Sequence, residues 1–317
     1  MGIIRRRRGG DEDGPVAEPD PEFRYFSREQ GAQFRALARQ VFAEQGVETV
    51  VYPTYLEAQG GQRYGLHNLA AACHGARRGE TDWPDVVKDH AERILRATSG
   101  PVPFEAISTE NVLAHTYLRV LNADSLPSRD SFGYARELAD GLLEVFALDQ
   151  PETVVMFRDE EVERFGLDAL REAGLTNLLA EPLGSHEVVS GFDESKLHVV
   201  MGESVFTASK VLVIRDVLRR TIADTDTPHG ILVCMPFRHQ LAFHVPKDAS
   251  AVPALQSLAG FAANGYEDGV GALSPFVYWW QDGRLQQLSR ADDDGALRVE
   301  VDGEFGSVLG RLLREGE

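Results

Sequence analysis

The sequence predicts an α+β protein, in which a mixed, mainly antiparallel sheet is covered by helices and preceded by a helical N-terminal region. Of the 317 residues, 43% are hydrophobic, which is enough to bury a sizeable core. Apolar residues recur with helical spacing in some segments and form short β-branched or aromatic runs in others. In the last third of the chain, short turns join neighbouring strand-like runs, which favours antiparallel pairing with helices on one face of the sheet.

The first predicted elements are mainly helical. Ser27 and Gln30 have the spacing of a capping box, which satisfies backbone amides at the start of a helix, and Gly46 ends that helix. After it we expect a strand at 47–52, a glycine-rich loop at 60–65, an alanine-rich helix at 66–78 and a further helix that begins at Asp82. The segment 99–103, Ser-Gly-Pro-Val-Pro, interrupts this pattern and marks a domain boundary.

Strands and helices alternate in the rest of the chain. The expected strands are 117–121, 142–148, 197–201, 231–237, 241–245, 276–281 and 284–288, and the expected helices are 134–139, 160–179, 208–222 and 251–263. The helix at 160–179 should form in two pieces, because Gly166 interrupts it.

The last predicted hairpin carries three large aromatic residues. Asp282 and Gly283 suit a two-residue type I′ turn, which sets the register of the strands on either side. In that register Gln281 lies opposite Arg284, Trp280 opposite Leu285 and Trp279 opposite Gln286. Because side chains alternate between faces, at least one aromatic lies on the less buried face unless a helix or a partner covers it. We therefore expect Tyr278, Trp279 and Trp280 to contribute to a partner-binding surface.

Around these elements the chain divides into four regions. We expect a disordered tail at 1–22, a mainly helical N-terminal region at 23–98, an α+β domain at 104–290 and an acidic C-terminal extension at 291–317. The tail contains a basic block, Arg5, Arg6, Arg7 and Arg8, that could make weak contact with an anionic membrane or a partner.

The overall charge bears on the class of partner. The chain has 32 Lys and Arg against 50 Asp and Glu, and 32 − 50 gives a formal net charge of −18. This excess of acid argues against nucleic-acid binding, which needs a basic surface, and would suit a basic protein partner. Cys73 and Cys234 are too few for a disulfide framework, so we expect a cytoplasmic protein. No run of about 20 apolar residues predicts a transmembrane segment.

The most polar interruption of the apolar pattern is Arg238-His239, between two predicted strands. An arginine there could bind an anion, and a histidine could act as acid or base near neutral pH. Ser209 and Lys210 lie at a predicted helix start, where backbone amides also favour anions. These four residues are the candidate ligand-binding residues. The alternative is a hairpin turn whose side chains are solvated or cap a neighbouring helix.

Motifs for metal binding and catalysis are incomplete. His67 and His74 share a helical face about 10.5 Å apart, too far to reach one ion together. His239 and His244 near Cys234 lack further ligands, and both cysteines lie in apolar stretches where a thiol is usually inert. We therefore predict no catalytic residue, no metal and no cofactor, and the sequence leaves open whether the protein is an enzyme.

A series of short motifs resembles a known family. They are Tyr64-Gly65-Leu66 with Asn68-Leu69, Trp83 with Val87 and His90, Leu142 to Asp149 followed by Pro151, Ala173 with Asn177-Leu178, Ala208-Ser209-Lys210, and Val233 to Leu241 with Pro236 and Arg238-His239. In this order they resemble the YtpQ-like bacterial proteins, a family of uncharacterised function, over residues 47 to 290. The resemblance implies a cytosolic bacterial α+β protein and supplies no catalytic residues.

Two functional hypotheses follow. The first is a non-catalytic protein that binds another macromolecule, in a regulatory or immunity-type role, because no catalytic motif is complete and the net charge favours a basic partner. The second is an enzyme or small-anion-binding protein with a pocket near Arg238 and His239.

Overall fold

The computed structural model describes residues 18–59, 61–99, 104, 107–126, 128–150, 153–292 and 297–315. The chain divides into two compact units, Met1–Lys88 and Asp89–Glu317. Two sequence predictions lie wholly or mostly outside the described residues, namely the tail with its arginine block at 5–8 and the boundary at 99–103.

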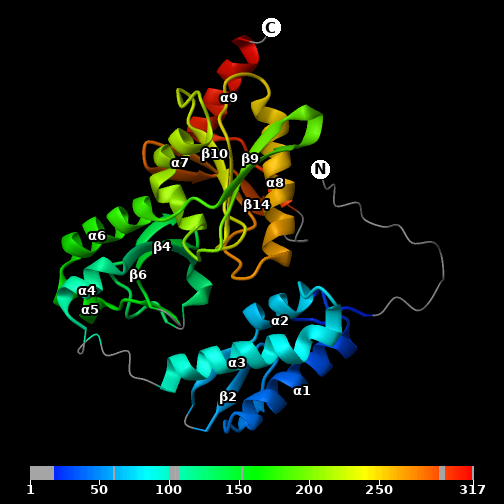
Figure 1. The fold of residues 1–317 in the computed structure, drawn as a ribbon. Helices are drawn as coiled ribbons and strands as arrows, with labels where there is room; N and C mark the ends of the chain where they lie inside the picture. Colours follow the sequence, from blue (N-terminus) through cyan, green and yellow to red (C-terminus); the bar gives the residue numbers. More distant parts are fainter. Residues whose placement is uncertain are drawn as a thin grey trace. The chain divides into compact units, whose positions relative to one another are not determined.

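The first unit combines helices with a small antiparallel sheet (Figure 1). Its elements are α1 (Arg28–Glu44), β1 (Thr49–Val51), β2 (Tyr55–Ala58), β3 (Arg63–Gly65), α2 (His67–His74), the 3-10 helix η1 (Gly79–Asp82) and the start of α3 (Trp83–Ser99). The predicted capping box is confirmed, since the Ser27 hydroxyl accepts from the Gln30 amide and the Gln30 side chain accepts from the Ser27 amide. The sequence missed the hairpin of β2 and β3, where glycines suggested a plain loop.

The second unit is built on a six-stranded antiparallel sheet in the order β13-β12-β10-β11-β9-β8. In chain order its strands are β8 (Ser185–Ser190), β9 (Lys196–Met201), β10 (Ile231–Cys234), β11 (Gln240–His244), β12 (Val277–Gln281) and β13 (Arg284–Gln287). The register predicted for the last hairpin is confirmed, with Gln281 opposite Arg284 and Trp280 opposite Leu285. Asp282 and Gly283 both have positive φ, as a type I′ turn requires.

Helices cover both faces of this sheet, and not one as expected. On one face lies α8 (Ala251–Asp268), and on the other lie the 3-10 helix η5 (Ala208–Val213) and α7 (Ile214–Thr221). Figure 1 shows α7 and α8 on either side of β9 and β10. The central strands are buried on both faces, which explains why they read as continuous apolar runs in the sequence.

A second, smaller antiparallel sheet also belongs to this unit. Its strands are β4 (Thr116–Asn122), β5 (Arg136–Ala139), β6 (Leu142–Asp149) and β7 (Val154–Met156), with α4 (Thr109–Ala114), α5 (Asp159–Phe165) and α6 (Leu167–Ala180) packed against it. The predicted break at Gly166 is confirmed. The predicted helix at 134–139 is wrong: Arg136 lies in β5 and pairs with Glu144 of β6, so tertiary pairing decides its conformation.

The C-terminal segment contributes to the core and is more than an acidic extension. It forms the hairpin of β14 (Ser289–Ala291) and β15 (Leu297–Val299), followed by α9 (Gly303–Glu315). Phe305, Val308 and Leu312 of α9 are buried in the same cluster as α8. Among the described helices, none combines the length and apolar character of a membrane span.

Candidate functional site

The aromatic residues predicted to form a partner surface are buried, so that prediction is wrong. Tyr278 and Trp280 pack on the side of the sheet covered by η5 and α7, and Trp279 packs on the side covered by α8 and α9. The Trp279 indole donates a hydrogen bond to the His229 carbonyl at 2.8 Å, and the Tyr278 hydroxyl is hydrogen bonded to the Ser274 hydroxyl at 2.7 Å. Helices cover both faces, so these side chains belong to the core.

Ser209 and Lys210 are fully buried and do not line a surface site, against the prediction. They lie in the 3-10 helix η5, and the Ser209 hydroxyl accepts from the Val120 amide at 2.9 Å. The Lys210 ammonium donates to the carbonyls of Leu178 and Glu181 at the C-terminal end of α6. Burial lowers the pKa of Lys210 to about 8. Both residues therefore hold elements together.

Arg238 and His239 lie, half-buried, in the turn between β10 and β11. The Arg238 Nε donates to His239 Nε2 at 2.9 Å, and His239 Nδ1 donates to the Ser204 carbonyl at 3.1 Å. Burial, and then the charge of Arg238, lowers the pKa of His239. The imidazole is therefore neutral and has both nitrogens engaged, which suits a positioning role better than proton transfer.

Arg119 is a candidate that sequence reasoning missed. It lies half-buried in the middle of β4, and its side chain contacts the Met156 sulfur at 3.8 Å. Burial, and then the charge of Arg238, lowers the pKa of Arg119 to about 10. Within the described ranges, neither Arg119 nor Arg238 forms an ion pair with a carboxylate. An arginine inside an otherwise alternating strand was the signal available in the sequence.

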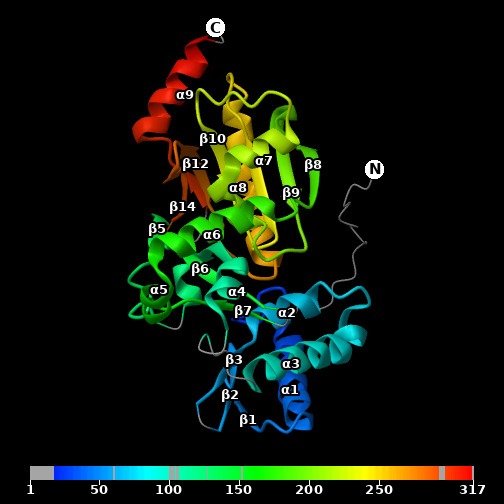
Figure 2. The ribbon, with the colours of Figure 1, turned by 60° about the vertical axis from the view of Figure 1, so that its left-hand side comes forward.

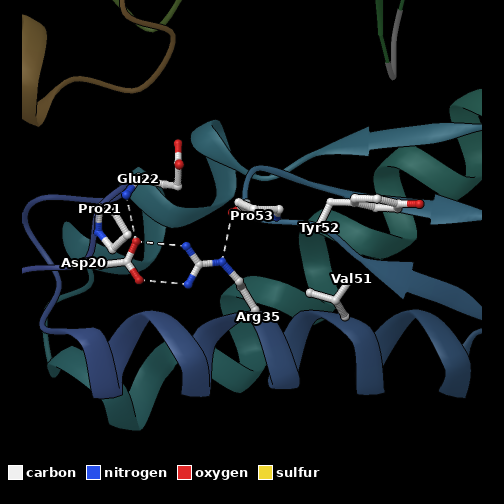
Figure 3. A pocket seen from close by; sticks show the side chains of 7 residues that line it. All are labelled: Asp20, Pro21, Glu22, Arg35, Val51, Tyr52 and Pro53. Carbon is white, nitrogen blue, oxygen red and sulfur yellow. Dashed lines mark hydrogen bonds and ion pairs between the residues drawn. The ribbon is translucent and has the colours of Figure 1, made fainter.

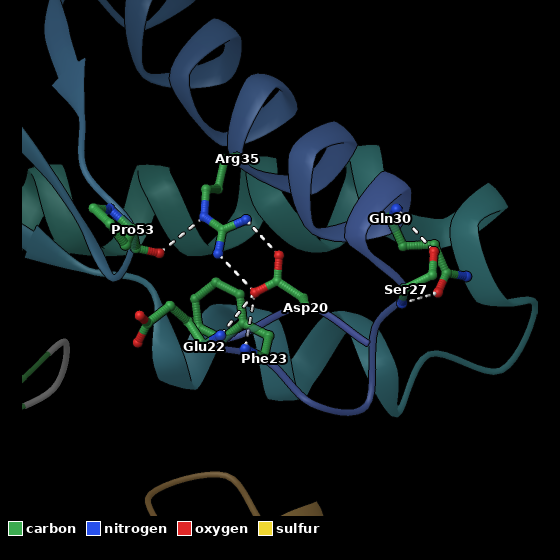
Figure 4. A network of polar contacts seen from close by, with 7 residues as sticks. All are labelled: Asp20, Glu22, Phe23, Ser27, Gln30, Arg35 and Pro53. Carbon is green, nitrogen blue, oxygen red and sulfur yellow. Dashed lines mark hydrogen bonds and ion pairs between the residues drawn. The ribbon is translucent and has the colours of Figure 1, made fainter. Parts of the chain in front are cut away.

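The first unit contains an open hollow of about 400 Å³ (Figure 3). Its lining residues are Asp20, Pro21, Glu22, Arg35, Val51, Tyr52 and Pro53. At its floor the Arg35 guanidinium donates to both carboxylate oxygens of Asp20 at 2.8 Å and to the Pro53 carbonyl, also at 2.8 Å. The Asp20 carboxylate also accepts from the amides of Glu22 and Phe23, as Figure 4 shows.

This network is structural. The Arg35 hydrogen bond, opposed in part by burial, lowers the pKa of Asp20 to about 2. It fastens residues 18–23 to α1 and to the segment before β2, so the folded region begins inside the predicted tail. Because Asp20 and Arg35 already bind each other and the backbone, the hollow offers a ligand few unused polar groups.

The strand β8 forms an open edge of the six-stranded sheet (Figure 2). Its only neighbour among the described strands is β9. β8 and β9 form a hairpin. At its turn end, Gly191 and Ser195 are a hydrogen-bonded pair, in which the Gly191 amide donates to the Ser195 carbonyl at 2.7 Å. Hydrogen-bonded and non-hydrogen-bonded pairs alternate along an antiparallel ladder. Counting back from Gly191, the backbones of Val189 and Glu187 bond to β9. The N–H and C=O groups of Ser190, Val188 and His186 therefore point away from β9.

Apolar side chains lie exposed along this edge. Val188 is 52% exposed, Val189 38% and Phe192, in the hairpin turn, 66%. The turn places Asp193 and Glu194 at positive φ, which is uncommon for residues other than glycine. It is held in this conformation by α8, whose Ser257 hydroxyl accepts from the Phe192 amide at 2.7 Å. The backbone of this turn is therefore fastened to α8, while the Phe192 side chain stays exposed.

In the part of the chain that the structure describes, no group of three or more His, Cys, Asp or Glu could hold a metal ion. No family model, curated protein or solved structure matches the chain. The resemblance to the YtpQ-like family therefore stays a prediction.

Proposed function

We propose that this protein works by binding another protein, and that β8 is where an extended segment of the partner pairs. The observation that carries the proposal is the open edge of β8, whose outward N–H and C=O groups alternate with exposed apolar side chains. Such an edge is a template for strand addition, in which backbone hydrogen bonds give affinity and side chains give specificity.

The chemistry of the partner segment follows from the side chains along the edge. Val188 and Val189 point to opposite faces of the sheet. Apolar side chains on either face of the added strand could therefore pack against one of them. Glu187, Asp193 and Glu194 are exposed beside them, and Lys196 is the exposed cation nearby. Together with the net charge of −18, this favours an extended segment with basic residues.

Photo-cross-linking tests this function. Phe192 is replaced by p-benzoylphenylalanine, which keeps an aromatic ring at the exposed turn, in cells that naturally make the protein. Leu313, an exposed apolar residue of α9, is replaced in the same way as a control. We expect a covalent adduct at position 192 and none at 313, with the cross-linked partner peptide in an extended, basic region.

A backbone substitution makes the test specific to strand pairing. Val188→Pro removes an outward N–H without removing a hydrogen bond to β9, because the amide of this residue faces away from that strand. We expect it to abolish the adduct, whereas Val188→Thr, which keeps the N–H, should retain it. Equal amounts of adduct in Val188→Pro and Val188→Thr would overturn the proposal. An adduct between two copies of this chain would show that β8 pairs with a second copy and not with a different protein.

A further inference from the structure

A second binding site is indicated where β4 meets the turn between β10 and β11. The Val120 amide, next to Arg119, is hydrogen bonded to the Ser209 hydroxyl at 2.9 Å. The adjacent Ala208 amide donates to the Arg238 carbonyl at 3.0 Å. The dipeptide Ala208-Ser209 therefore ties the backbone next to Arg119 to the backbone of Arg238. The two guanidinium groups are near enough for the charge of Arg238 to act on Arg119.

Positive charge predominates around the two guanidinium groups, since Arg238 acts on Arg119 and Arg93 acts on Arg238. Each is half-buried, and neither forms an ion pair with a described carboxylate. Asp149 is near enough for its charge to act on Arg119, but the two form no ion pair, and the positive charge of Arg238 acts on Arg119 more strongly. Buried charges in proteins are normally paired, because an unpaired one loses its hydration without compensation.

The hydrogen bonds of the two arginines leave terminal guanidinium N–H groups that could bind an anion. Arg238 uses its Nε on His239, so the two terminal nitrogens of its guanidinium are not committed to that contact. Among the described residues, the hydrogen-bond partner of the Arg119 guanidinium is the Met156 thioether sulfur, contacted by one terminal nitrogen, and a thioether is a weak acceptor. Planar guanidinium groups with free terminal N–H pairs bind carboxylates and phosphates in a bidentate manner.

We propose that Arg119 and Arg238 together bind a small oxyanion, either a phosphate or a dicarboxylate, with His239 positioning the Arg238 side chain. This site uses residues distinct from those of β8, and it would remain if the strand-pairing function failed. Ser209 has a scaffolding role here, because its hydroxyl holds β4 beside the Arg238 turn.

The probes are inorganic phosphate and malonate, titrated at constant ionic strength set with sodium chloride. We expect one of them to raise the melting temperature of the wild-type chain saturably, and the two arms distinguish phosphate from dicarboxylate. Arg119→Met and Arg238→Met should each weaken this binding by about tenfold or more, since a hydrogen-bonded charge contributes roughly that much. Arg284→Met, at an exposed arginine of β13, should leave it unchanged.

The unliganded protein gives a second readout that a purely structural arginine would not. If Arg119 and Arg238 bind an anion, neither has its partner in the unliganded protein. Arg119→Met removes such an unpaired charge, so without ligand it should not lower the melting temperature and could raise it. The proposal would be overturned if Arg119→Met lowers the melting temperature without ligand and neither probe raises the melting temperature of the wild type saturably. Binding that Arg284→Met weakens as much as Arg119→Met would also overturn it.

Discussion

At the scale of single residues, chemical type was visible in the sequence but burial was not. Lys210 and Ser209 were predicted to bind a ligand because of what they are, yet Lys210 donates to the C-terminal carbonyls of α6. Arg119 was overlooked because its strand looked like ordinary core. Whether a polar residue faces solvent, a helix end or another charge depends on tertiary neighbours, which one sequence does not reveal.

The buried position of Trp279 gives the first prediction. Trp279→Ala should lower the free energy of unfolding by about 3–5 kcal/mol, because it removes a packed aromatic ring and its hydrogen bond to His229. Leu313→Ala, at an exposed position of α9, should change it by less than about 0.5 kcal/mol. Chemical denaturation of both variants measures this difference, and equal small effects would show that Trp279 is a surface residue.

The Asp20–Arg35 pair gives a prediction about acid. The Asp20 carboxyl keeps its charge down to about pH 2 when folded, against a usual pKa of 3.8. The unfolded chain binds the extra proton, so the pair stabilises the protein above pH 4, and this contribution is lost as the pH falls from 4 towards 2. Asp20→Asn should cost roughly 2 kcal/mol at neutral pH and lose this part of the acid sensitivity.

Amide exchange of α1, followed by mass spectrometry, monitors this part of the molecule. Glu18→Gln is the control, because the Glu18–Arg28 pair is exposed and should contribute less than about 0.5 kcal/mol. If Asp20→Asn and Glu18→Gln exchange alike, the network shown in Figure 4 does not fasten the start of the chain to α1.

At the scale of elements, local signals succeeded where a turn or a cap specifies the geometry. Asp282-Gly283 determined the register of the last hairpin, and Ser27 with Gln30 the start of α1. The segment 134–139 was predicted as a helix, but Arg136–Ala139 forms β5 and pairs with β6, although its arginine, glutamate, leucine and alanine favour helices. The strand β8 was missed, because an edge strand needs no continuous apolar pattern.

A histidine ladder ties β8 to the sheet and should make its attachment sensitive to acid. His198 stacks between His186 of β8 and Phe243 of β11, with His186 Nε2 hydrogen bonded to His198 Nδ1 at 3.1 Å. Burial, and then the charges of His186, His244 and Lys196, lowers the pKa of His198 from its usual 6.5 to about 4. The unfolded chain binds more protons between these values, so stability falls as the pH drops from 6.5 to 4.

His198→Phe should flatten this pH dependence, because it keeps the stacking and removes the titrating group. His115→Gln, at an exposed histidine of the same unit, should not. The urea midpoint measured at several values between pH 7 and pH 4 gives the comparison. A wild-type midpoint that does not fall over this range would contradict the role of the ladder.

At the scale of the whole molecule, the α+β class was predicted and is confirmed, while the domain boundaries stay predictions. The segment Ser99–Pro103 is the strongest break in the sequence pattern. Brief digestion of the full chain with subtilisin should therefore cut first between α3 and α4 and leave two resistant fragments. First cuts inside α6 or β6 would contradict a boundary there.

The central claim is that β8 accepts a strand from another protein, and amide exchange in the complex tests it most directly. On adding the partner identified by cross-linking, the amides of His186, Val188 and Ser190 should gain protection. Those of Glu187 and Val189, already bonded to β9, should change little. This alternation is the result that strand pairing predicts. Unchanged exchange at His186, Val188 and Ser190 with saturating partner would contradict it.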